Sequence, residues 1–329
     1  MNGPRDYFFD NAKYLLMMLV VLGHGLEIVS GKYSNEIYRF IYLFHMPCFV
    51  AIAGYFAKFH KRAKVWNLLL QYVIFQTLYC LFSIFVLDQN TKVQYSRPYW
   101  ILWFLLSLFC WKVILPYVSR LKYPLLFAIV AALIVGYDSS IGYTLGLSRT
   151  IVFFPFFLAG YYLKKEHFNK IKELSFVIPL AIILVSVMAL YFKSDFHRGL
   201  LYNSRSYSAM GLNPYFAWLY RLAFLLWGAL LGLSFFYFVP KGKVFFSAFG
   251  ARTMQVFLLH GFMMRYLGHI KISKMLNAPS LKILFYIGLL VAANILALRI
   301  VEILTTPLMK PIKTINLIKD SLRCRHNQR

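Results

Sequence analysis

Charged residues are scarce in this sequence, and acidic residues are the scarcest of them. Only 14% of the 329 residues are charged and only 11 are Asp or Glu, whereas a soluble globular domain has roughly 25% charged residues. A soluble fold would need far more polar surface than this chain can supply. Hydrophobic residues make up 60% of the chain, in runs of about 20 residues, the length that crosses the hydrocarbon core of a bilayer. The sequence therefore predicts an all-α polytopic membrane protein.

Patterns typical of disulfides, metal sites and cleaved leaders are also missing. The four cysteines, Cys48, Cys80, Cys110 and Cys324, form no CxxC pair, so we expect neither a disulfide framework nor a zinc site, and no metal cofactor. The first residues, MNGPRDYFFDNAK, mix acids with bases, and no small-residue cleavage site follows them. We therefore expect the first hydrophobic segment to stay in the mature protein.

About ten hydrophobic segments are predicted to span the membrane, which would place both termini on one side. The segments lie at about 12–29, 36–56, 64–87, 99–118, 123–137, 146–163, 174–192, 215–239, 247–268 and 281–304. Residues 1–309 then form one transmembrane domain, and residues 310–329 form a basic tail.

Basic residues are distributed unevenly between the two predicted sides. Of the 36 Lys and Arg residues, 20 lie on the side of the termini, 8 on the other side and 8 within the segments. The positive-inside rule therefore predicts that both termini are cytoplasmic. Because the basic residues are spread over short loops, topology and anionic membrane lipids account for the net charge of +25. We expect no nucleic-acid partner.

Ionisable side chains within membrane segments are costly, so they are candidates for function. The histidines His24, His45 and His260 are predicted to lie at similar depth, at or beyond the midplane, together with Arg149. Each imidazole alone could simply hydrogen-bond a neighbouring helix, but a set matched in depth favours a shared site. Other ionisable residues can reach a surface or pair locally and need no function. These are Lys112, Lys282, Arg299 and Glu302.

The first segment, DNAKYLLMMLVVLGHGLE, carries Lys13 and His24 eleven residues apart. Eleven residues make about three helical turns, so both side chains share one face, roughly 16 Å apart along the axis. Glu27 follows three residues after His24, where it can orient the imidazole or raise its basicity. A long ligand could therefore place an anionic head at Lys13 and a reactive end at His24.

Lys13, ten intervening residues and His24 resemble the Arg/Lys-x10-His signature of the acyltransferase-3 family of integral membrane O-acyltransferases. The fucose 4-O-acetylase-like subgroup is the most similar, and the resemblance covers about residues 5–304. Two departures are Lys13, where many relatives have arginine, and the turn Ala53-Gly54-Tyr55, where many have Ser-Gly-Phe. Ordered blocks that carry the resemblance include LFHMPCFVAIAGYFAK at 43–58, YWILWFLLSLF at 99–109, SRTIVFFPFFLAGYYL at 148–163 and SAFGARTMQVFLLHGF at 247–262.

The resemblance implies a ten-span enzyme of the plasma membrane. It would transfer an acyl group, usually acetyl, from cytoplasmic acyl-CoA to a hydroxyl of a cell-envelope glycan or lipid-linked sugar. His24 would then act as the general base, assisted by Glu27. Tyr202 and Tyr207, in the outer loop 193–214, could stack on sugar rings, or they could equally be ordinary membrane-interface aromatics.

Two further groups of residues are assigned by the same resemblance. The phosphates of the donor would be held by Lys13, Lys58, Lys61, Arg62 and Lys64. Candidates to stabilise the oxyanion or hold the acceptor are His45, Trp103, Arg149 and His260.

Two other classes of function stay open. A transporter or flippase for an envelope glycan would use the intramembrane charges as a translocation path, and it would not cleave acyl-CoA. A structural subunit of a polysaccharide export complex would leave the Lys13–His24 register unexplained, and it would tolerate loss of His24.

Overall fold

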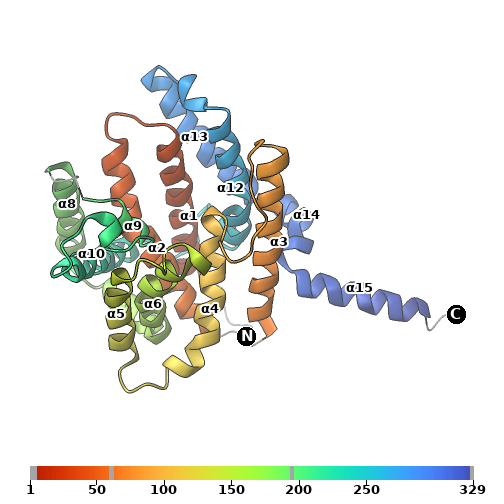
Figure 1. Ribbon diagram of the computed structural model, residues 1–329, viewed down its shortest axis with the longest axis horizontal. Coiled ribbons are helices and arrows are strands. Elements are labelled where there is room, and N and C mark those ends of the chain that lie inside the picture. Colours follow the sequence, from red (N-terminus) through yellow and green to blue (C-terminus); the bar gives the residue numbers. More distant parts are fainter. Residues whose placement is uncertain (1–5, 59–62, 193–195, 327–329) are drawn as a thin grey trace.

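The computed structural model describes residues 6–58, 63–192 and 196–326. Over these residues it is helical throughout, without strands, and the helices gather into one bundle from which the last helix extends (Figure 1). The α-helices are α1 (Tyr7–Ile28), α2 (Ser34–Ala57), α3 (Ala63–Phe85), α4 (Trp103–Val118), α5 (Pro124–Ile134), α6 (Leu147–Tyr162), α7 (Lys165–Ile171), α8 (Val177–Phe192), α9 (Gly199–Tyr202), α10 (Ala217–Phe238), α11 (Ser247–Gly250), α12 (Thr253–His269), α13 (Pro279–Leu296), α14 (Arg299–Met309) and α15 (Pro311–His326).

Local sequence signals explain several of the helix starts. The Asp6 side chain caps α1 by accepting a hydrogen bond from the Phe8 amide at 3.2 Å. Pro124 and Pro279 stand at the first positions of α5 and α13, where a missing N–H costs nothing. Pro311 likewise begins α15 directly after α14, because proline cannot donate a hydrogen bond within the preceding helix.

Six helical segments in the described part of the chain are long and apolar enough to cross a bilayer. Two shorter apolar helices, Pro124–Tyr137 and Val177–Phe192, accompany them. Neither α1 nor α12 is among the six, although both lie in segments that the sequence predicts to span the membrane. The all-helical membrane class is therefore confirmed, and the count of ten and the orientation of the termini stay predictions. The six segments are Ser34–Ala57, Val65–Phe85, Trp100–Val118, Thr144–Tyr162, Ala217–Phe238 and Pro279–Leu296.

The last predicted segment, 281–304, is not one continuous helix. Helix α13 ends at Leu296, and extended backbone at Leu298 separates it from α14. Helix α14 is amphipathic: Ile303 and Leu304 are exposed, while Glu302 forms an ion pair with Arg252, the residue before α12. The expected single span was therefore wrong over its last turns, because hydropathy alone does not detect a break between two apolar helices.

The outer surface of the bundle is strongly apolar. Side chains of α5, α8 and α13 such as Phe127, Val185, Phe192 and Leu284 are more than half exposed. Soluble monomers rarely expose apolar patches of this extent, whereas lipid chains solvate them readily. The helical composition and this surface together make the chain a multi-pass membrane protein.

The backbones of helices α2 and α6 approach each other closely where the two helices cross. A Cβ atom added at Gly54 would lie 1.9 Å from the Phe157 carbonyl oxygen, and one added at Gly160 would lie 1.9 Å from the Ala51 carbonyl oxygen. Only glycine permits this reciprocal contact, as in other membrane helix pairs with small residues at the interface. The crossing fixes α2, which carries His45, against α6, which carries Arg149.

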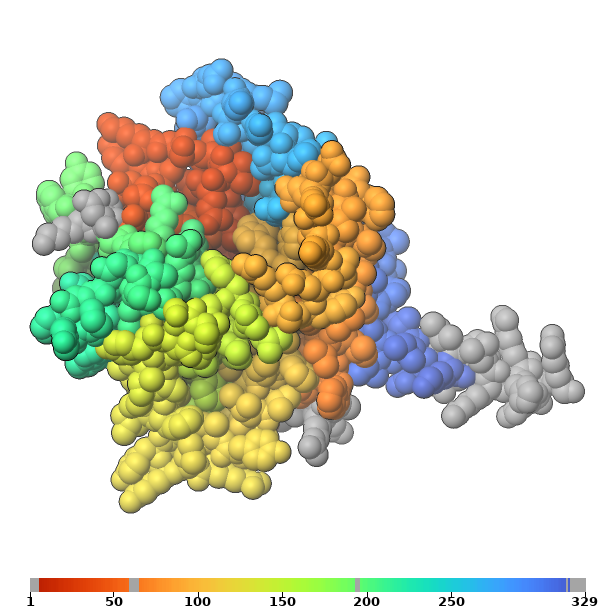
Figure 2. Space-filling model, in the orientation of Figure 1, coloured from red at the N-terminus to blue at the C-terminus, as the bar shows by residue number. Residues whose placement is uncertain are grey.

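Helix α1 lies inside the bundle, where it packs against α2, α11, α12 and α13. One face of the molecule is hollowed between the red N-terminal helices, the orange α3 and the yellow-green segment around α6, and deeper parts of the chain show through the gap (Figure 2). Several hydrophobic residues of α1, including Leu16 and Val21, are fully buried. Lys13 and His24 are therefore held in the interior of the bundle.

Candidate active site

His24 and Glu27 form a hydrogen-bonded pair within α1. The Nδ1 atom of His24 lies 2.9 Å from Oε2 of Glu27, and the hydroxyl of Tyr42 on α2 lies 3.0 Å from the same nitrogen. A carboxylate only accepts hydrogen bonds, so Nδ1 carries the imidazole proton. The Nε2 atom of neutral His24 then presents a lone pair, as a general base requires.

Two tyrosines from distant segments hold the other oxygen of the Glu27 carboxylate. Its Oε1 atom accepts hydrogen bonds from the hydroxyls of Tyr38 at 2.9 Å and Tyr202 at 3.1 Å. These two hydroxyls also contact each other. The carboxylate is thus fixed from α2 and α9 as well as from α1, and the orientation of the imidazole follows from it.

Aromatic rings enclose the other faces of His24. The ring of Trp100, in the short helical turn before α4, lies 4.5 Å away between centroids, and the ring of His260 lies 5.6 Å away at an interplanar angle of 21°. Trp100 has a φ of 39°, a left-handed conformation that non-glycine residues rarely adopt. Such local strain often accompanies functional sites, and here it places an indole against the imidazole.

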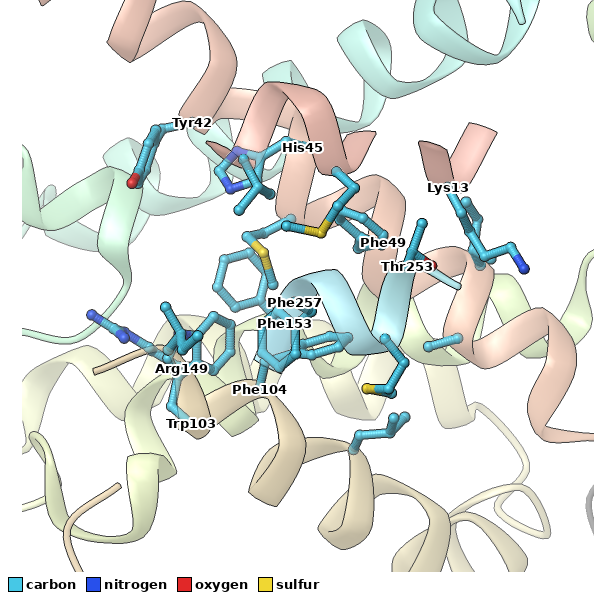
Figure 3. A pocket seen from close by; sticks show the side chains of 18 of the residues that line it. Lys13, Tyr42, His45, Phe49, Trp103, Phe104, Arg149, Phe153, Thr253 and Phe257 are labelled. Atoms are coloured by element: carbon cyan, nitrogen blue, oxygen red, sulfur yellow. The ribbon is translucent and has the colours of Figure 1, made fainter. Parts of the chain in front are cut away.

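His24 and Glu27 line a cavity of about 430 Å³, which we call the central cavity. Lys13, His45, Trp103 and Arg149 line it too. Figure 3 shows Lys13 and Thr253 toward one end, Arg149 and Trp103 toward the other, and aromatic rings between them. The structure therefore brings together six residues that the sequence singled out, from α1, α2, α4 and α6.

Hydrogen bonds restrict what the two further histidines can do. Nδ1 of His45 donates to the Ile41 carbonyl oxygen at 2.8 Å, and Nδ1 of His260 donates to the Val256 carbonyl oxygen at 2.9 Å. A neutral ring held in this way has only an acceptor at Nε2, so it cannot donate to an oxyanion. His45 lines the central cavity, whereas His260 is fully buried beside it and its Nε2 has no partner among the described residues.

Arg149 and Trp103 lie together at the end of the cavity opposite Lys13. The guanidinium of Arg149 is 5.1 Å from the indole centroid of Trp103, and its Nε donates to the Tyr202 carbonyl oxygen at 3.0 Å. Both side chains carry N–H donors. They are the two oxyanion candidates whose chemistry fits that role.

The cationic residues predicted for the donor do not all meet in one place. Lys13 lines the cavity and forms an ion pair with Asp10 at 3.0 Å, a partner three residues before it. Lys58 instead donates to the Leu163 carbonyl oxygen at 2.6 Å, outside the cavity. Lys61 and Arg62 lie outside the described residues, as does the side chain of Lys64.

The two tyrosines of the predicted outer loop have different environments. Tyr202 lines the central cavity and contacts Glu27. Tyr207 is 1% exposed, donates to the Leu133 carbonyl oxygen at 2.8 Å and lies 4.5 Å under the guanidinium of Arg221. The expectation that Tyr207 stacks on a sugar was wrong, because its ring is buried between α5 and α10.

A family model described as an acyltransferase domain, that of acyltransferase-3, matches residues 6–300. The chain belongs to this acyltransferase family. Among curated proteins, the acyltransferase is similar to nodulation protein NolL of Sinorhizobium fredii, with 45% identity over 58 residues, and of Mesorhizobium japonicum, with 42% identity over 59 residues. Each alignment covers 16% of this chain and 16% of the relative, so only a small part of the relatives' length is matched. No solved structure matches the acyltransferase significantly.

Several residues of the site could not be identified from the sequence. Tyr38, Tyr42 and Trp100 reach His24 or Glu27 from other elements, and nothing in their local pattern distinguishes them from ordinary interface aromatics. Asp10 did carry a signal, because it precedes Lys13 by three residues, the helical spacing of an ion pair.

Proposed function

We propose that this membrane acyltransferase transfers an acyl group, most simply acetyl, from acyl-CoA to a hydroxyl of a carbohydrate, with His24 as the general base. The observation that carries the proposal is the His24–Glu27 pair on the wall of a cavity that has Lys13 at its far end. A thioester donor has the same shape, with an anionic head and a reactive end joined by a thin arm.

The proposed reaction is a direct transfer. Nε2 of His24 takes the proton of the acceptor hydroxyl as its oxygen attacks the thioester carbonyl carbon. The tetrahedral intermediate then collapses, the carbon–sulfur bond breaks, and the thiolate leaves with the proton from the imidazolium. Glu27 accepts the Nδ1–H throughout and stabilises the imidazolium that forms between the two steps.

The remaining cavity residues supply binding and charge stabilisation in this proposal. Arg149 and Trp103 would donate to the oxyanion of the tetrahedral intermediate, and His45 would accept a hydrogen bond from the carbohydrate. Lys13 would face the anionic part of the donor. The donor would extend between both ends of the cavity, because its negative charges and its thioester carbon are far apart.

The finer features of the function are also proposals. We place the enzyme in the plasma membrane with ten spans and cytoplasmic termini, because of the distribution of basic residues. We propose an envelope glycan or lipid-linked sugar as acceptor, in line with the resemblance to fucose 4-O-acetylase-like proteins. The donor would then enter from the cytoplasm and the acceptor from the opposite face.

The test uses purified protein in lipid nanodiscs with radiolabelled acetyl-CoA and a panel of monosaccharide glycosides, fucosides included. We expect labelled ester to form with the unmodified chain, and His24→Ala to lower the rate at least about a hundredfold. His269→Ala is the matched control, because this histidine is exposed at the end of α12. Transfer by His24→Ala at a near-normal rate would remove the assigned base, and a chain that never consumes acetyl-CoA would point to a transporter.

A further inference from the structure

A second cavity, which we call the basal cavity, lies beside the central cavity. It has a volume of about 690 Å³ and is lined by residues of α3, α4, α12, α14 and α15. Lys112, Ala251 and Met254 line both cavities, so the two spaces meet at this wall. The shared wall lies beside Thr253, which Figure 3 shows toward the Lys13 end of the central cavity, away from Arg149.

The basal cavity is strongly cationic. Its described lining holds four basic side chains, those of Lys112, Arg252, Lys310 and Lys313, and one carboxylate, that of Glu302, which leaves a net charge of +3. The carboxylate is already neutralised, because Arg252 lies 2.9 Å from it and Lys310 3.7 Å. The hydrogen bond from Arg252 lowers the pKa of Glu302 below its usual value, so the pair persists at neutral pH. A surplus of positive charge in a pocket attracts a polyanion.

Polar groups of α3 give the basal cavity a fixed shape. Nδ2 of Asn67 donates to the Met309 carbonyl oxygen at 3.4 Å, and Nε2 of Gln71 donates to the same oxygen. These bonds hold the junction of α14 and α15 against α3. Gln71 is 5% exposed and its Oε1 has no partner among the described residues, so it offers an acceptor to an O–H or N–H group of a ligand.

We infer that the basal cavity binds the phosphorylated nucleotide half of a coenzyme A thioester, whose pantetheine arm passes the wall of Lys112, Ala251 and Met254 into the central cavity. The inference rests on the proposed function and assigns α14 and α15 to the donor site. Lys310 and Lys313 contact phosphate groups, and Gln71 accepts a hydrogen bond from the nucleoside. Lys112, which the sequence suggested could merely reach a surface, lies where the pyrophosphate would join the arm.

The chemistry explains why two cavities are needed. Coenzyme A joins a bulky polyanion, adenosine 3′-phosphate 5′-diphosphate, to a thin uncharged arm. The central cavity is lined mainly by aromatic and aliphatic side chains, so it suits the arm. The basal cavity has the volume and the charge that the nucleotide requires.

The test compares the double variant Lys310→Gln/Lys313→Gln with Lys319→Gln, an exposed lysine of α15 outside both cavities. Binding of adenosine 3′,5′-bisphosphate to the protein in nanodiscs is measured by calorimetry. We expect the double variant to weaken this binding and to raise the KM for acetyl-CoA, each about tenfold, because two charge-assisted contacts are lost. Turnover of acetylpantetheine, which lacks the nucleotide, should stay within about twofold, as should every measurement on Lys319→Gln.

The outcomes separate the inference from the proposed function. If acetyl-CoA is consumed but the double variant binds adenosine 3′,5′-bisphosphate normally, the nucleotide lies elsewhere and the inference is overturned. If binding is lost as expected but no ester forms with any acceptor, the inference stands and the acyl-transfer proposal fails. An anionic lipid headgroup is the other source of phosphate. A lipid would be indicated if turnover depends on phosphatidylglycerol in the unmodified chain but no longer in the double variant, while the double variant still binds the nucleotide. That result also overturns the inference.

Discussion

The carboxylate of Glu27 is the residue-scale feature on which the proposed chemistry depends most. It contacts His24 through one oxygen and Tyr38 and Tyr202 through the other. Both oxygens are therefore held in place, and the imidazole cannot rotate without breaking a charge-assisted hydrogen bond. The arrangement keeps the proton of neutral His24 on Nδ1, so the reactive lone pair always faces the same direction.

Replacing this carboxylate by an amide tests that reasoning. We expect Glu27→Gln to lower kcat by about 10²- to 10⁴-fold with little change in the KM for the donor, because the amide neither stabilises the imidazolium nor fixes its tautomer. Tyr38→Phe removes one bond to the carboxylate and should have a much smaller effect. Glu166→Gln, at an exposed glutamate of α7, is the control. Steady-state kinetics measure both variants. An equal loss of kcat in Glu27→Gln and Tyr38→Phe would argue against a special role for the negative charge of Glu27.

The residues of the site differ in how far the sequence predicts them. Lys13, His24 and Glu27 share α1, so helical geometry alone relates them. Tyr42 and Trp100 reach His24 across helix interfaces, and no sequence spacing encodes such contacts. The positive φ of Trp100 is likewise a product of the tertiary fold, since tryptophan has no intrinsic preference for it.

At the scale of helices, the crossing of α2 and α6 fixes the walls of the central cavity. Their backbones touch at Gly54 and Gly160, and the same two helices carry His45 and Arg149. The sequence identified both segments by their hydropathy, but it gave no indication of how closely they approach. The end of α13 at Leu296 was missed for a related reason, because the apolar composition continues into α14.

A side chain at this crossing should destabilise the whole bundle. We expect Gly160→Val to cost about 1–3 kcal/mol or more and to lower the thermal denaturation midpoint, because the added atoms meet the Ala51 backbone rather than a movable side chain. Gly288→Ala in α13 is the control, since a Cβ there meets nothing within 4 Å. Removing a helical glycine at that open position should be neutral or stabilising by up to about 1 kcal/mol. Equal midpoints for the two variants would show that the crossing can accommodate a side chain at position 160, contrary to the close backbone contact in the structure.

At the scale of the whole molecule, an apolar exterior surrounds a polar interior. Charged and polar side chains such as Arg221 and Gln76 are buried inside the bundle, while large apolar side chains cover its outside. This inverted distribution follows directly from the composition, which is why the membrane class could be predicted. The count of ten spans stays a prediction, and α1 is one of the ten although it combines apolar length with three charged residues at Asp10, Lys13 and Glu27.

Labelling from each side of the membrane tests the predicted orientation. In a background with all four cysteines replaced by serine, Gly242→Cys should react with an impermeant maleimide only from the cytoplasm. Gly142→Cys should react only from the opposite side. Both positions have open space around a new Cβ, so neither variant disturbs the fold. Reaction of both cysteines from the same side would contradict the alternation of spans between them.

The bonds that close the basal cavity join residues made at very different times during synthesis. Asn67 and Gln71 belong to α3, and the Met309 carbonyl oxygen that they hold is 242 and 238 residues further along the chain. A nascent protein halted before α14 would already contain His24, Glu27 and every described residue that lines the central cavity. It would still lack Glu302, Lys310 and Lys313. The basal cavity is therefore completed only after α14 and the start of α15 have been made, long after the residues around His24.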